Sequence, residues 1–135
     1  MLSPFECLCG NFILPEPASY VFFYAFSNLR NLLYIIPASR PVIAAKRDNM
    51  DEYDTIFVGF PIWWYIAPTI INTFLESYDL KGKTIIPFAT SGGSDMGKTN
   101  EKLAPSCPGA KLLHGKVFNS YSSKADLSAW AETLS

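Results

Sequence analysis

Two short segments of the chain carry residues suited to binding a flat, polar ring. Residues 61–65 read Pro-Ile-Trp-Trp-Tyr and residues 90–94 read Thr-Ser-Gly-Gly-Ser, and each follows an apolar run. Aromatic stacking contributes roughly 0.5–1.5 kcal/mol beyond area burial. Small residues let a ligand approach backbone N–H groups that can read the polar edge of a ring. The candidate cofactor-binding residues are Pro61, Ile62, Trp63, Trp64, Tyr65, Thr90, Ser91, Gly92 and Gly93.

The same residues also have an ordinary structural interpretation. Trp63 and Trp64 could be core side chains, and the glycine pair could be a plain turn. Successive side chains of a strand point to opposite faces, so two adjacent tryptophans cannot both face the same side. We therefore expect at least one of them to lie outside the core, and both interpretations stay open at this point.

Residues 92–99 match a second pattern, the G-x-x-x-x-G-K-[ST] of a phosphate-binding loop. In that interpretation Lys98 would contact the β- and γ-phosphates of a nucleotide, and Thr99 would bind Mg²⁺. The chain after Thr99 contains no apolar strand ending in Asp that could serve as the metal partner. A P-loop nucleotide-binding protein, using Gly92 to Thr99, is therefore the less favoured alternative.

The remaining reactive side chains point to structural roles. His114 is expected to be a partly buried histidine in a strand, and Cys107 a loop thiol. Cys7 and Cys9 are one residue too close for a redox C-x-x-C pair, and the three cysteines lack zinc-ligand spacing. No nucleophile and base stand out, so the sequence predicts no catalytic residue and no metal site.

Composition indicates a single compact domain over residues 1–135. Hydrophobic residues make up 49% of the chain and charged residues only 17%, which excludes a disordered chain. The net charge is -1 with no basic stretch, so no nucleic-acid partner is expected. Three cysteines cannot all pair in disulfides, which is typical of proteins in a reducing compartment, so we expect a cytoplasmic protein.

The first third of the chain differs from the rest. Residues 1–45 carry four charged side chains, whereas the following ninety carry nineteen. Residues 18–36 approach the length of a membrane span but contain Asn28, Arg30 and Asn31 near the middle. We expect this segment to pack against the domain, and no membrane span is predicted.

From residue 54 onward, apolar strands alternate with helices. The expected strands are residues 55–60, 83–90 and 111–118, and the expected helices start at Pro68, run through residues 98–104 and follow Ser123. This order predicts an open parallel sheet covered by helices. Both candidate segments then lie at the carboxyl edge, where such sheets bind ligands. Pro87 lies inside the second strand, which should either end near Ile86 or contain a bulge.

The stretch from Arg40 to Asn119 resembles small bacterial flavodoxin-like proteins, the FMN-binding flavodoxin family. The pairing of Pro-Ile-Trp-Trp at residues 61–64 with Thr-Ser-Gly-Gly-Ser at residues 90–94 is the most specific part. The resemblance implies a flavodoxin-like α/β fold that binds FMN and transfers electrons or reduces small acceptors. It also implies that residues 61–65 flank the isoalloxazine ring and that residues 90–93 lie along its pyrimidine edge. The flavin would then carry the redox chemistry of a possible FMN-dependent oxidoreductase.

The amino-terminal residues depart from the family pattern. Residues 1–39 contain one glycine, Gly10, and no Ser/Thr- and Gly-rich loop of the T-x-T-G-x-T kind that holds the FMN phosphate. We interpret them as an atypical apolar segment before a family-like core of residues 40–135. Our hypothesis for this departure is a shifted reading frame or a mis-assigned start. Losing two or three charge-assisted hydrogen bonds, at about 1.5–3 kcal/mol each, would weaken FMN binding by several powers of ten. A cofactor-free scaffold, acting by association or without function, is the main alternative.

The missing first strand has a structural consequence. In the flavodoxin strand order that strand lies in the middle of the sheet, so the strand at residues 55–60 would have a bare apolar edge. We expect residues 20–26 or 32–36 to cover this edge, or a second copy of the chain to pair there as a homodimer.

Overall fold

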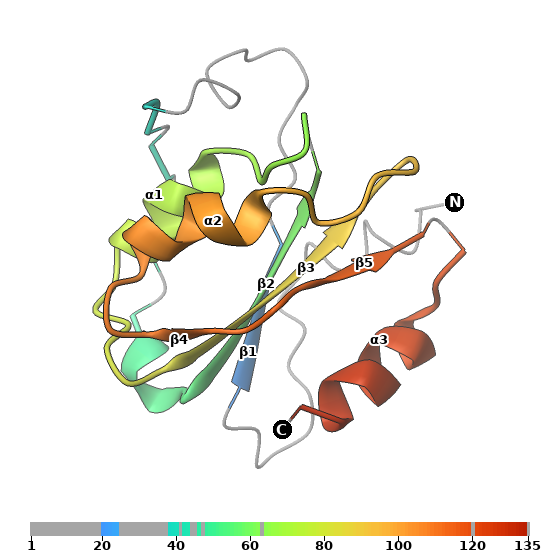
Figure 1. The fold of residues 1–135 in the computed structure, drawn as a ribbon. Coiled ribbons are helices and arrows are strands. Elements are labelled where there is room, and N and C mark those ends of the chain that lie inside the picture. Colours follow the sequence, from blue (N-terminus) through green and yellow to red (C-terminus); the bar gives the residue numbers. More distant parts are fainter. Residues whose placement is uncertain are drawn as a thin grey trace.

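A computed structural model of the chain describes residues 20–24, 38–40, 42–43, 46, 48–62, 64–119 and 121–134. The elements within these ranges are β1 (Tyr20–Tyr24), η3 (Met50–Glu52), β2 (Thr55–Pro61), α1 (Ile70–Glu76), β3 (Thr84–Thr90), α2 (Thr99–Leu103), η4 (Ala104–Ser106), β4 (Lys111–Leu112), β5 (Lys116–Phe118) and α3 (Lys124–Glu132). The strands form one open sheet in the order β1-β2-β3, with β4 and β5 both beside β3, and all pairs are parallel (Figure 1). The predicted open parallel sheet is confirmed.

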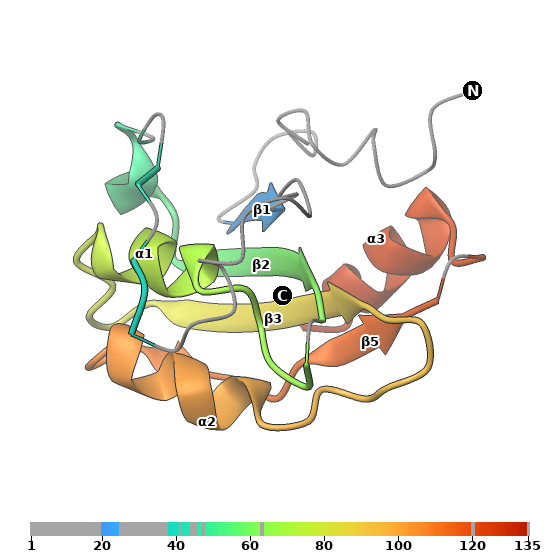
Figure 2. The same ribbon diagram turned by 90° about the horizontal axis from the view of Figure 1, so that it is seen from above.

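The two central strands are buried on both faces, which explains their nearly continuous apolar sequence. Ile56, Val58 and Phe60 of β2 belong to a core cluster that includes side chains of α1 and α2. Phe57, between them in sequence, belongs to a second cluster with Leu127 and other α3 residues. Helices α1 and α2 therefore cover one face of the sheet and α3 covers the other (Figure 2).

Strand β1 covers the edge of β2. Residues 20–24 pair in parallel register with residues 55–59. The expectation that an amino-terminal piece covers this edge is confirmed for residues 20–24, and the alternative at residues 32–36 lies outside the described residues. In the part of the chain that the structure describes, no helix is long and apolar enough to cross a membrane.

Strand β3 runs through Pro87 without a break, so both expected outcomes, an end near Ile86 and a bulge, are wrong. The carbonyl of Ile85 accepts a hydrogen bond from the N–H of Leu113 on the side of β4. Because strand residues two apart point to the same neighbour, the backbone of Pro87 faces that side too. On that side the neighbouring strand is interrupted between β4 and β5. The proline nitrogen, which has no hydrogen to donate, faces this interruption. The strand predicted at residues 111–118 is therefore split in two.

Gly115 lies in this interruption because a side chain would not fit there. A Cβ atom at this position would lie 2.9 Å from the carbonyl oxygen of Pro87 and would overlap the methyl group of Met96. The close approach of three segments explains why only glycine is accommodated without rearrangement.

The helix ends agree with the sequence to within a few residues. Helix α1 begins two residues after Pro68, and α2 ends before Pro105, although the chain continues through Pro105 as η4. Ser123 caps α3 as expected, since its hydroxyl accepts a 3.2 Å hydrogen bond from the Asp126 N–H. In return the Ser123 N–H donates to the Asp126 carboxylate over 2.7 Å, and this bond, with a second from the Ser123 hydroxyl, lowers the pKa of Asp126.

Candidate functional site

The two candidate loops leave the sheet side by side. Pro61, the last residue of β2, is the register partner of Thr90, the last residue of β3. One residue further on, the N–H of Ile62 donates a 2.9 Å hydrogen bond to the carbonyl of Thr90. The structure thus brings both segments together at the carboxyl edge of the sheet (Figure 2).

The aromatic loop is exposed and conformationally strained. Trp64 is 78% exposed and Tyr65 is 65% exposed, so the interpretation of Trp64 as a core side chain is wrong. Both residues have positive φ angles, 52° and 66°. Bulky residues seldom adopt this conformation, and it persists only where the surroundings hold it. Trp63 lies outside the described residues.

The segment that starts α2 holds this loop in place. The N–H of Lys98 donates a 3.1 Å hydrogen bond to the carbonyl of Tyr65. Gly97, with a φ of 52°, packs so closely that a Cβ atom there would lie 2.5 Å from the same carbonyl oxygen. Sequence reasoning missed this supporting role, because Gly97 and Lys98 drew attention only as part of the P-loop pattern.

The serine–glycine loop is closed by its own hydroxyl. The Oγ of Ser91 accepts hydrogen bonds from the N–H groups of Gly93 and Ser94, over 3.2 and 2.8 Å. These two N–H groups therefore face into the loop, contrary to the expectation that this loop presents its donors to a ligand. The glycines still leave room, since nothing lies within 4 Å of a Cβ built on Gly92 or Gly93. There is therefore open space beside the backbone of both glycines.

The geometry does not fit a P-loop. A phosphate-binding loop turns several N–H groups toward the phosphates, and the residue after its lysine reaches Mg²⁺. Here the N–H groups of Gly93 and Ser94 donate to Ser91, and that of Gly97 donates to Asp95 over 2.8 Å. Thr99 is completely buried, so its hydroxyl cannot reach a metal at the surface of the loop.

The expectation for His114 is corrected, whereas Cys107 lies in a loop as expected. His114 is exposed rather than partly buried, because it lies in the interruption between β4 and β5. Cys107 is buried after η4, and burial raises the pKa of its thiol. Cys7 and Cys9 lie outside the described residues. Within the described ranges, no three His, Cys, Asp or Glu side chains gather as metal ligands do.

A second polar cluster joins α1 to η4. The guanidinium of Arg40 donates a 2.8 Å hydrogen bond to Glu76, whose other carboxylate oxygen accepts a 2.8 Å bond from the Ser106 hydroxyl. Asn72 in turn donates to Ser106 over 2.9 Å. The hydrogen bond from Arg40, with that from Ser106 and the charge of Arg40, lowers the pKa of Glu76, and burial opposes this shift.

The lowered pKa of Glu76 predicts a loss of stability in acid. Folding favours the charged carboxylate, so its contribution is complete above the ordinary pKa of 4.5 and is lost as the pH falls through the lower value of the folded state. The pair is partly exposed, so the contribution is on the order of 0.2–1 kcal/mol. Urea unfolding at pH 7 and pH 3 should show a smaller pH dependence for Glu76→Gln and Arg40→Gln than for the wild type. Identical dependence in all three proteins would contradict this.

The open parallel sheet, with two candidate ligand-binding loops at its carboxyl edge, defines a flavodoxin-like α/β protein. The sequence matches the flavodoxin family over residues 33–134, and the chain belongs to that family.

Two solved structures are similar to this chain. One is a candidate flavoprotein from Bacteroides eggerthii, 42% identical with a TM-score of 0.63 over 73% of this chain and 61% of that one. The other is a candidate flavoprotein from Bacteroides uniformis, 44% identical with a TM-score of 0.64 over 72% of this chain and 62% of that one. This chain therefore spans about three fifths of the length of these relatives. No functionally curated protein matches it. The family and both relatives suggest a flavin cofactor.

Proposed function

We propose that this chain binds FMN at the carboxyl edge of its sheet and serves in electron transfer or in the reduction of small acceptors. The flavin supplies the redox chemistry when bound, so the protein has to bind, orient and shield the ring. The observation that carries the proposal is the pairing of two loops, an exposed aromatic loop and an open glycine loop, joined by the Ile62–Thr90 hydrogen bond.

Each loop has a distinct part in this proposal. The aromatic loop would contact the flat face or the edge of the isoalloxazine ring through Trp64 and Tyr65. Trp63, which precedes them in the sequence, would contribute to the same contact. Residues 90–93 would lie along the pyrimidine edge, where the two glycines leave space for the ring to approach the backbone. Ser91 would stabilise the conformation of the glycine loop, because its hydroxyl oxygen accepts hydrogen bonds from the N–H groups of Gly93 and Ser94.

Residues 1–39 contain no loop of the T-x-T-G-x-T kind. We therefore expect FMN and riboflavin to bind this chain with dissociation constants that differ by less than about threefold. A phosphate held by several backbone N–H groups would add several kcal/mol for FMN alone. Titration of the full chain with each flavin, followed by quenching of tryptophan fluorescence, measures both dissociation constants. Much tighter binding of FMN would show that the chain holds the phosphate after all, while leaving the ring site intact.

A cofactor-free scaffold is the second candidate, favoured by the absence of a recognisable phosphate loop in residues 1–39. The same titration separates it from the flavin proposal. Quenching by neither flavin, together with a colourless purified protein, would reject the flavin proposal in favour of the scaffold.

A further inference from the structure

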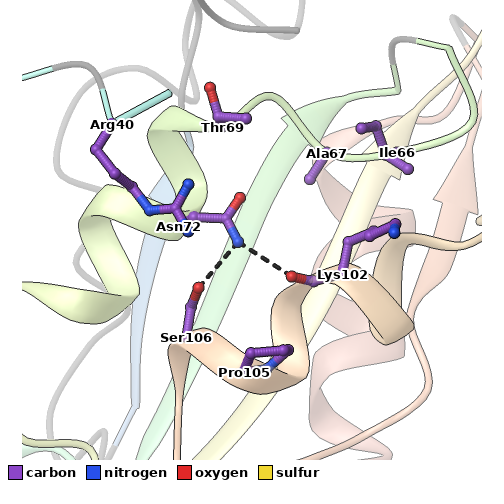
Figure 3. A pocket seen from close by; sticks show the side chains of 8 residues that line it. All are labelled: Arg40, Ile66, Ala67, Thr69, Asn72, Lys102, Pro105 and Ser106. Carbon is purple, nitrogen blue, oxygen red and sulfur yellow. Dashed lines mark hydrogen bonds between the residues drawn. The ribbon is translucent and has the colours of Figure 1, made fainter. Parts of the chain in front are cut away.

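A cavity of about 120 Å³ lies between α1, the end of α2 with η4, and the chain that leads into α1 (Figure 3). It contains none of the residues assigned to the proposed flavin site. The residues that line it are Arg40, Ile66, Ala67, Thr69, Asn72, Lys102, Pro105 and Ser106. The inference drawn from it is therefore independent of the proposed function.

Buried polar side chains concentrate around this cavity. Four polar side chains are buried in the described part of the chain, and three of them, Thr69, Asn72 and Ser106, line the cavity. Buried polar groups are costly unless they have hydrogen-bond partners. Such a gathering beside an open space is typical of a polar binding site.

The hydrogen bonds fix the orientation of the Asn72 amide group at the cavity. The carboxylate of Glu76 can only accept, so the Ser106 hydroxyl donates to it and presents its oxygen to Asn72. The amide nitrogen of Asn72 donates to that oxygen over 2.9 Å and to the carbonyl of Lys102 over 3.1 Å. The amide oxygen is turned the other way, toward Thr69 (Figure 3), and has no hydrogen-bond partner among the described residues.

The charges around the cavity narrow the class of ligand. Arg40 and Lys102 would attract an anion, but its acceptor atoms would be repelled by the Asn72 oxygen, which is itself an acceptor. A cation would meet Arg40 and Lys102, and Glu76, the carboxylate of this cluster, is already paired with Arg40. An uncharged molecule with an O–H or N–H donor avoids both conflicts, and Ile66, Ala67 and Pro105 offer apolar contact for its body.

We propose that this cavity binds a small uncharged molecule with one apolar ring and one hydrogen-bond donor, which the amide oxygen of Asn72 accepts. The size agrees, since a cavity of about 150 Å³ holds benzene and this one opens at its mouth, so a ring need not be fully enclosed. The interaction is a neutral hydrogen bond in a partly apolar site, so binding is weak but selective for the donor.

Phenol and toluene test the proposal, because they have the same shape and only phenol has a donor. Each is added to the full chain, and binding is followed by ¹H–¹⁵N NMR at the side-chain amide of Asn72 and the backbone amides of Ala67 and Ser106. Phenol should bind roughly three- to tenfold more tightly than toluene, because one neutral hydrogen bond changes a dissociation constant by about this factor. In Asn72→Leu, which keeps the volume but removes the acceptor, this preference should disappear.

Two results of this experiment would overturn the proposal. Equal affinity for the two probes, or no shift at these amides, would overturn the proposal and leave a cavity filled by water alone. A preference for phenol that persists in a folded Asn72→Leu variant would also overturn it. The wild-type comparison decides the question even if the variant does not fold.

Discussion

Replacing Trp130 by alanine is expected to lower the free energy of unfolding by roughly 3 kcal/mol. The indole ring packs edge-on against Phe57, Phe88 and Phe118, with ring centroids 5.6, 6.2 and 5.3 Å away. Lys116 lies 5.9 Å from the same indole ring. The ring is partly buried between α3 and the sheet, so removing it takes away these contacts. Urea unfolding measures the loss.

The same substitution at Trp64 is the matched control and has the opposite profile. Trp64 is 78% exposed, so Trp64→Ala should change the free energy of unfolding by less than about 0.5 kcal/mol. It should weaken flavin binding roughly tenfold, because stacking on an aromatic ring is worth about 1–3 kcal/mol. Equal loss of stability in the two variants would contradict the assignment of Trp130 to the packing between α3 and the sheet and of Trp64 to the site.

Replacing Gly97 by alanine is expected to cost about 2–4 kcal/mol of stability and to displace the aromatic loop. A residue with a side chain at a φ of 52° costs about 1–2 kcal/mol, and the new Cβ would lie 2.5 Å from the Tyr65 carbonyl oxygen. The backbone must then shift, and the hydrogen bond from Lys98 to Tyr65 is lost. Flavin affinity should fall with it.

Gly92→Ala is the control for Gly97→Ala, since nothing lies within 4 Å of its Cβ position. This variant should stay as stable as the wild type in thermal unfolding. If Gly97→Ala also unfolded at the wild-type temperature and bound flavin equally well, Gly97 would not support the aromatic loop as described.

The regular part of the fold could be predicted because its signals are local. The apolar runs of β2 and β3 indicate strands buried on both faces, and Ser123 followed by Asp126 gives a capped helix. The covered edge of β2 was also predictable, since a bare apolar strand edge requires a partner.

The irregular features depend on contacts between segments distant in sequence. The split between β4 and β5 follows from the approach of Met96 and Pro87 to Gly115, which no local pattern encodes. The burial of Cys107 depends on how η4 packs against the core. In the site, composition and the position after two predicted strands indicated the two loops, but the contact of Gly97 with Tyr65 emerges only in three dimensions.

An NMR titration of the full chain with FMN tests most directly whether a flavin ring lies between the two loops. The backbone amide signals of both loops, Trp64 and Tyr65 in one and Gly92 and Gly93 in the other, should shift together with a single dissociation constant. Signals of α3, on the other face of the sheet, should stay in place. Shifts confined to one loop, or an unchanged spectrum at millimolar FMN, would contradict this account of the site.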